Sequence, residues 1–320
     1  MKSTSELTDF YYNELYPDLQ ELEKERKALR SKVIGVFGFI TLITLGIIYM
    51  VGEGDGDGDG VFFVGALGFA IAGFAYKLMI KDYTFEFKEK IIRPLIKAID
   101  DNLKYSPTLH IPQHLFTASR LFTKDIDRFS GNDLVRGDIG DVNLSFSDIH
   151  AEYETRDSKG KSSWHTIFRG LFIAADFNKH FKGSTVILPD SAEKTFGSLI
   201  GGWLQKNNIG RNDLVKMDNP EFEKAFVVYG SDQIEARYIL THSMMKRLLD
   251  YKERTQQDIY ISFINTKIHL GIYYDKDLFE PTLFTSLLDY KQAISYTQTL
   301  QLSIGIVEEL KLNEKLWSKV

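Results

Sequence analysis

The chain has 320 residues, of which 26% are charged, and its 39 basic and 44 acidic residues give a formal net charge of −5. This near balance excludes a strongly basic, nucleic-acid-binding protein. The sequence contains no cysteine, which excludes disulfides, thiolate metal sites and cysteine nucleophiles.

Two long apolar stretches near the N-terminus, residues 33–51 and 61–80, predict a transmembrane hairpin with a connecting loop at 52–60. A helix needs about 20 apolar residues to cross a bilayer, and each stretch supplies them. Before the hairpin, residues 1–32 predict a juxtamembrane helix with Leu15, Leu19, Leu22 and Leu29 on one face. This leucine face suits either packing against later helices of the chain or a coiled-coil seam.

Basic residues flank the hairpin and are missing from its loop. Arg26, Lys27, Arg30 and Lys32 precede the first stretch, and Lys77 and Lys81 mark the end of the second. By the positive-inside rule, both termini face the cytoplasm. We therefore expect a two-span protein of the plasma (inner) membrane, with the lipid bilayer as one partner.

The remainder of the chain predicts an α+β fold. Residues 81–106 form an amphipathic helical stalk that Pro94 interrupts, and residues 107–320 form a cytoplasmic domain, either single or split near 210–220. Antiparallel strands are expected where apolar and polar residues alternate or short apolar runs occur. These stretches include 142–146, 167–177, 184–189 and 259–274. Helices are expected at 241–252 and from Pro281 to about Leu310.

Few residues suggest chemistry. The sequence has no G-x-S-x-G, G-x-x-x-x-G-K or H-E-x-x-H motif. Asp176, Glu235 and Arg237 are the candidates for a carboxylate and arginine site, in which Arg237 would bind an anionic headgroup or a partner carboxylate. The structural alternative places Glu235 and Arg237 on one strand face as an ion pair, with Asp232 capping a turn.

Two patterns resemble metal sites. His110 and His114 have a spacing that suits one helical face, although Pro112 lies between them. Asp55, Asp57 and Asp59 repeat the start of an EF-hand loop, but its closing glutamate position is Ala66. We therefore expect a solvated turn and surface histidines, with no metal and no cofactor.

Small residues on the second apolar stretch, among them Gly65, Gly68 and Ala72, allow close helix packing. This face suits packing within the hairpin, or a homo-oligomeric contact.

The chain resembles a bacterial membrane protein family known as domain of unknown function 3137. The resemblance rests on the stretches VRGDIGDVNLSFSDI, IFRGLFIAADFNKHFKG and NPEFEKAFVVYGSDQIEARYILT, which end at Ile149, Gly183 and Thr241. In the family a proline often follows this threonine, whereas His242 stands here. The resemblance implies two membrane spans and a mixed domain, and it implies no activity.

The sequence thus predicts a membrane-anchored protein whose cytoplasmic domain binds a protein or lipid partner without catalysis of its own. One alternative is a membrane-bound hydrolase or transferase that uses the carboxylate and arginine site. A second alternative is an oligomeric membrane scaffold that associates through the spans and the N-terminal helix.

Overall fold

The computed structural model describes residues 3–53, 58–122, 124–177, 179–190, 213–310 and 312. The chain divides into two compact units. The helical unit comprises Thr4–Leu95 and Phe279–Thr297. The sheet unit comprises Ile96–Leu278 and Gln298–Val320, together with Met1–Ser3.

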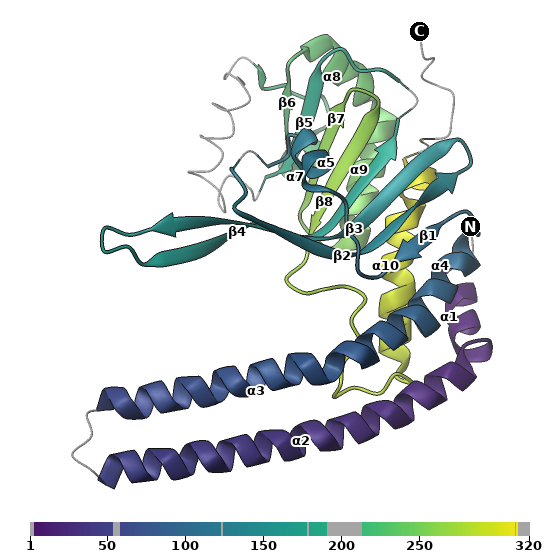
Figure 1. The fold of residues 1–320 in the computed structure, drawn as a ribbon. Helices are drawn as coiled ribbons and strands as arrows, with labels where there is room; N and C mark the ends of the chain where they lie inside the picture. The colour runs from purple at the N-terminus through teal and green to yellow at the C-terminus, as the bar shows by residue number, and fades with distance from the viewer. Residues whose placement is uncertain are drawn as a thin grey trace. The chain divides into compact units, whose positions relative to one another are not determined.

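Long helices make up the helical unit (Figure 1). Helix α1 covers Thr4–Asn13, α2 covers Tyr16–Glu53 and α3 covers Gly58–Phe87, and a π-helical turn, η1 (Lys88–Ile92), leads into α4 (Arg93–Ile99). The hairpin connection is therefore shorter than residues 52–60, because α2 continues to Glu53 and α3 already begins at Gly58.

The two long helices pack against each other over their apolar stretches. The rings of Phe37 and Tyr76 lie 6.2 Å apart. Further along, the side chain of Thr44 occupies the space where a Cβ on Gly68 would lie. The Thr44 hydroxyl donates to the Ile40 carbonyl at 2.8 Å. Gly68 therefore serves the packing within the hairpin, as its small-residue pattern indicates.

Two helices, within Tyr16–Met50 and Gly60–Ile99, are long and apolar enough to cross a membrane. A core helix of a soluble protein would be mostly buried, but only 6% of each most apolar window is buried. The exposed large side chains include Phe39, Leu42, Tyr49, Met50, Phe62, Phe69 and Phe74. Lipid is the environment that such a surface suits.

The π-helical turn Lys88–Ile92 ends two residues before Pro94, the second residue of α4. Proline lacks an amide hydrogen and crowds the preceding turn, so the regular hydrogen-bond pattern cannot continue through it. A local π-helical turn is one way to absorb that break. It occurs where the sequence predicts an interruption of the stalk.

The sheet unit contains one eight-stranded antiparallel sheet in the order β1-β2-β3-β4-β8-β7-β5-β6. Residues from both sides of 210–220 contribute to it. The strands are β1 (Lys104–Ser106), β2 (Arg128–Ile139), β3 (Val142–Arg156), β4 (Ser162–Asp176), β5 (Ser184–Pro189), β6 (Phe226–Gly230), β7 (Ile259–Ile264) and β8 (Lys267–Tyr273). The α+β prediction is confirmed.

Helices cover the two faces of this sheet. Phe116 of the short helix α5 (Gln113–Ala118) lies in an apolar cluster with Phe168 and Phe172 of β4 and Ile149 of β3. Figure 1 shows α5 in front of the sheet and α9 (His242–Thr255) behind it. The buried residues of α9 recur at helical spacing: Met244, Met245, Leu248, Tyr251 and Thr255.

Thr241 caps the start of α9, where its side chain accepts the Met244 amide at 3.2 Å. Proline is favoured at the first helical position because its φ angle suits the helix. Because the Thr241 cap already stabilises the start of α9, the helix can begin with His242 in place of a proline.

The structure corrects two sequence predictions. Residues 233–239 form helix α8 (Gln233–Ile239), so the expected strand face of Glu235 and Arg237 is wrong. The reason is local: the Asp232 carboxylate accepts the amides of Ile234 and Glu235 at 2.9 and 3.0 Å and so caps a helix. The C-terminal helix α10 (Tyr290–Glu309) begins later than Pro281, at a site where the Asp289 carboxylate accepts the Lys291 amide at 2.8 Å.

Candidate functional site

Glu235 of α8 holds the loop that follows β4. Its carboxylate accepts the backbone amides of Lys182 and Gly183 at 3.1 and 2.8 Å. A Cβ on Gly183 would press against the Ser231 hydroxyl and would lie 3.3 Å from the Glu235 carboxylate. Glycine therefore permits the close approach of the loop to α8, and Glu235 fixes it there.

Lys179 in the same loop lies between Glu235 and an aromatic ring. Its ammonium is 3.9 Å from the Glu235 carboxylate and 4.1 Å from the ring centre of Tyr238. Burial lowers the pKa of Lys179, and the nearby carboxylate of Glu235 opposes this effect. The cation and ring contact fixes the Tyr238 side chain on the surface of α8.

Asp176 lies at the end of β4 and has its own cationic partner. Its carboxylate is 2.6 Å from the Lys267 ammonium. Directly after it, Phe177 donates its amide to the Thr266 carbonyl at 2.7 Å, and Phe181 donates to the Asn265 carbonyl at 2.5 Å. The structure thus places Asp176 and Glu235 against the same short loop, with a different lysine beside each.

Arg237 does not pair with Glu235. Residues two apart on a helix point in different directions, whereas residues three and four apart share a face. Ile234 precedes Arg237 by three residues and Tyr238 by four, so it shares a face with each of them; Arg237 is exposed, Ile234 is 82% exposed and Tyr238 is 54% exposed. We name Ile234, Arg237 and Tyr238 the α8 patch.

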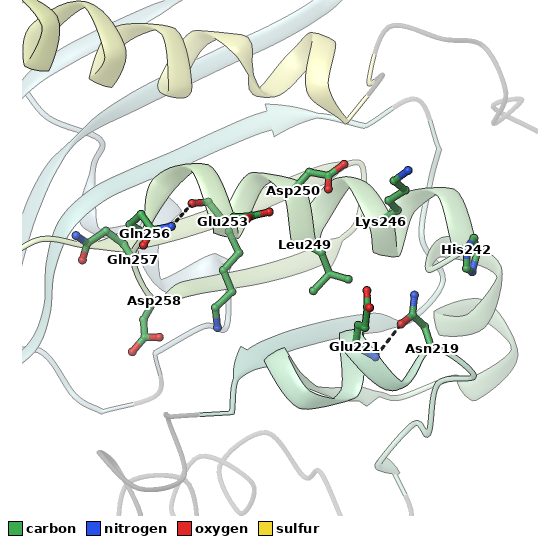
Figure 2. Close-up of a pocket in the computed structure, with 11 residues that line it drawn as sticks. Asn219, Glu221, His242, Lys246, Leu249, Asp250, Glu253, Gln256, Gln257 and Asp258 are labelled. Atoms are coloured by element: carbon green, nitrogen blue, oxygen red, sulfur yellow. Dashed lines mark hydrogen bonds between the residues drawn. The ribbon is translucent and has the colours of Figure 1, made fainter.

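A polar groove of about 830 Å³ lies between α9 and the short helix α7 (Pro220–Ala225) (Figure 2). Asn219 caps α7 by accepting the Glu221 amide at 3.0 Å, and Gln256 donates to the Glu253 carbonyl at 2.6 Å. The Lys252 ammonium donates to the Ala225 carbonyl at 3.2 Å. The Lys252 hydrogen bond links α9 to the end of α7, and the mixture of acids and bases along the groove is typical of a solvated helix face.

Only part of the predicted metal-ligand set lies within the described residues. His110 lies ahead of α5, with its Nδ1 atom 2.9 Å from the Ile111 carbonyl oxygen, whereas His114 is exposed on the first turn of the helix. Asp55 and Asp57 lie outside the described residues, and so does the side chain of Asp59. Within the described part of the chain, no group of three or more His, Asp or Glu side chains could hold a metal ion.

Strands β3 and β4 extend beyond the predicted strand stretches 142–146 and 167–177, because β3 continues to Arg156 and β4 already begins at Ser162. Trp164 lies in the extended part of β4, and the Arg128 guanidinium lies 3.8 Å from the centre of its ring. The rings of Tyr153 and His165 stack with their centres 5.0 Å apart. The turn itself is closed by Asp157, which accepts the amides of Lys159 and Lys161. A strand is recognised in sequence by alternating apolar and polar residues, and this pattern is lost here because polar residues lie on both faces.

Residues 166–312 match the sequence model of a family described as "Protein of unknown function (DUF3137)". This match confirms the resemblance. It covers both predicted carboxylates, Arg237 and the whole α8 patch, and it assigns no activity to them.

Among solved structures, the chain is similar to the mycobacterial trehalose monomycolate transport factor A. The two chains are 10% identical with a TM-score of 0.32, over 65% of this chain and 89% of the other. A TM-score of this size does not establish a shared fold. The comparison with curated proteins finds no match.

Proposed function

We propose that this protein is a membrane-anchored binding protein. In this proposal, the apolar helices α2 and α3 hold it in the plasma (inner) membrane of a bacterium with both termini in the cytoplasm. The sheet unit binds a protein partner through the α8 patch and performs no catalysis.

The observation that carries the proposal is the exposure of the α8 patch on a rigid support. Ile234 is 82% exposed although it lies in the first turn of a capped helix. An apolar side chain beside an exposed tyrosine and arginine has the composition of a binding hot spot. The Asp232 cap and the Glu235 contacts fix this helix, so binding would cost little ordering entropy.

Charge around the α8 patch indicates the chemistry of the partner. Arg237 and Lys182 are exposed on the patch and its adjoining loop. A partner that presents an apolar side chain beside a carboxylate would fit both properties, because a guanidinium binds carboxylates with two parallel hydrogen bonds. A protein surface offers this combination more readily than a lipid headgroup layer does.

The surroundings of the predicted carboxylates support binding over a hydrolase or transferase. The Asp176 carboxylate pairs with Lys267. Glu235 accepts two backbone amides and lies beside Lys179. These contacts occupy the oxygen atoms that a general base would need to accept a proton from a substrate. Both carboxylates therefore suit a structural role.

Photocrosslinking from the patch tests the proposal in cells that express the full-length protein. A benzophenone amino acid at Ile234 should form one adduct of defined mass, which mass spectrometry then identifies. Arg237→Glu in the same chain should abolish the adduct. With the identified partner purified, Arg237→Glu should weaken binding about 30-fold or more, since interface arginines often contribute 2 kcal/mol or more.

Lys246 on the polar groove provides the matched control, because it is an exposed residue of a neighbouring helix. A benzophenone at Lys246 should give no such adduct. The binding proposal is wrong if both positions give the same adducts, or if the Ile234 position gives none.

The orientation has its own test. Alkaline phosphatase fused within residues 52–60 should be active, because this enzyme needs an oxidising compartment for its disulfides. Fusion after Lys104 should be inactive. The opposite pattern would show that the sheet unit lies outside the cytoplasm.

A further inference from the structure

The segment of residues 279–289, which we name the return segment, is fastened to the helical unit. Its apolar residues Phe279, Leu283 and Leu287 are buried. The Arg26 guanidinium donates to the Leu283 carbonyl at 2.5 Å, and the Leu287 amide donates to the Glu23 carboxylate at 3.1 Å. Residues 279–289 therefore have a fixed position along α2.

Phe284 is the exception within the return segment. It is 61% exposed, although the residue before it is buried. The Arg30 guanidinium lies 5.8 Å from the centre of its ring. Packing within the helical unit leaves most of this aromatic surface uncovered, so the contact with Arg30 sets its position without burying it.

That position lies beside the start of the first apolar stretch. The first exposed apolar residue of this stretch is Ile34. It follows Arg30 by four residues, which is about 6 Å along a helix axis. Phe284 is therefore next to the boundary where the exposed surface of α2 changes from charged to apolar.

Helix α3 presents similar residues at the same level. The contact between Phe37 and Tyr76 aligns the two helices, so the residues after Tyr76 run back alongside the residues before Phe37. Lys81 and Phe85 thereby lie near the level of Lys32 and Arg30, and all of these side chains are exposed. The stretch from Lys81 to Phe85 also contains an acidic residue, Asp82. We name Arg30, Lys32, Lys81, Phe85 and Phe284 the interfacial belt.

We propose that the interfacial belt binds the headgroup layer of the membrane that α2 and α3 cross. Phe284 and Phe85 enter the boundary between headgroups and acyl chains, and the three cations bind anionic headgroups. A phenyl ring gains by leaving water for the apolar side of this boundary, and anionic headgroups attract lysine and arginine side chains that lie beside the membrane. The belt continues the apolar surface of the two helices, and its cations suit a negatively charged leaflet. This inference rests on the membrane placement in the proposed function.

The test uses the full-length chain, which has no native cysteine and so accepts a single label cleanly. Phe284→Cys carries an environment-sensitive fluorophore in nanodiscs of mixed anionic and zwitterionic lipid that contain headgroup-level spin-labelled lipid as the quencher. Tyr290→Cys is the matched control, because Tyr290 is 62% exposed and its ring stacks on Tyr12, ahead of the start of α2. Leu42→Cys, with acyl-chain quenchers, reports on membrane insertion itself.

We expect at least twofold stronger quenching at position 284 than at position 290. Adding Arg30→Gln should reduce the quenching at 284 in anionic nanodiscs. Strong quenching at 42 with equally weak quenching at 284 and 290 would overturn the belt and leave the membrane anchor intact. Weak quenching at all three positions would overturn the membrane placement as well. Equal quenching at 284 in purely zwitterionic nanodiscs would overturn the role of the cations.

Discussion

Each unit of this protein contains a largely buried glutamate that fixes a segment distant in the sequence, but the two glutamates are neutralised differently. Glu23 of the helical unit accepts two hydrogen bonds from Arg26, at 2.8 and 2.7 Å, and one from the Leu287 amide. Glu235 of the sheet unit accepts two backbone amides, and its cation, Lys179, lies 3.9 Å away.

This difference in hydrogen-bond donors shows which contact each carboxylate depends on. Arg26 forms a fork with Glu23 and also donates to the return segment, and their side chains are only 5% and 7% exposed. Removing either partner leaves a buried charge. Glu235 lies nearer to solvent and depends on amide donors. The helical unit should therefore be the more sensitive of the two to loss of a single charge.

The largest expected effect is that of Arg26→Met. This change leaves the Glu23 carboxylate buried beside an apolar side chain, which should cost about 3–5 kcal/mol of stability in the helical unit. Hydrogen exchange of the Leu287 amide, measured by mass spectrometry in detergent or nanodiscs, would report it as lost protection of the return segment.

Lys27→Met is the matched control for this prediction. Lys27 also lies near the Glu23 carboxylate, at 3.7 Å, but its side chain is 70% exposed. Such an exposed pair contributes about 0–1 kcal/mol. Equal loss of protection in the two variants would show that burial does not decide the strength of the Arg26 contact.

Acidification should weaken the sheet unit before the helical unit. Burial lowers the pKa of His269 in β8 from its usual value of 6.5 to about 4, so the unfolded chain binds a proton that the folded chain rejects. Stability supplied by neutral His269 is therefore lost as the pH falls from about 6.5 towards 4. A shift of this size corresponds to about 3 kcal/mol.

Glu23 titrates in a lower range, because the hydrogen bond from Arg26 holds its pKa below the usual 4.5. Its contribution is present above pH 4.5 and is lost only at lower pH. Hydrogen exchange between pH 7 and pH 4, corrected for intrinsic rates, should show β7 and β8 losing protection before the return segment. His269→Gln should flatten the response of the strands, and His242→Gln on the surface of α9 should leave it unchanged. Loss of protection at the same pH in both units would contradict the assignment of the earlier loss to His269 and the later loss to Glu23.

The smallest expected effect is that of Glu235→Gln. The amide oxygen still accepts a hydrogen bond, but the charge that strengthens the contacts with Lys182 and Gly183 is lost, at a cost of about 1 kcal/mol. The amides of these two residues should exchange faster, while the return segment stays protected. Glu253→Gln, an exposed change on α9, is the control and should alter neither. A loss as large as that of Arg26→Met would remove the distinction between the two glutamates.

Most of the fold is readable from the sequence because it follows from local patterns. The length and hydropathy of the two apolar stretches predict α2 and α3, and the spacing of Met244, Met245 and Leu248 predicts α9. The prediction failed at residues 233–239, where the apolar run suggested strand. Asp232 decides in favour of helix there, and a capping aspartate looks the same in sequence as one in a turn.

By itself, the sequence determined the apolar spans and the antiparallel strands, because each depends on residues close together in the chain. Only the tertiary structure decided which partners the buried charges take. The Leu287 amide reaches Glu23 across 264 positions of sequence, and the Gly183 amide reaches Glu235 across 52. No local pattern encodes such pairings, since they form only when packing brings the segments together.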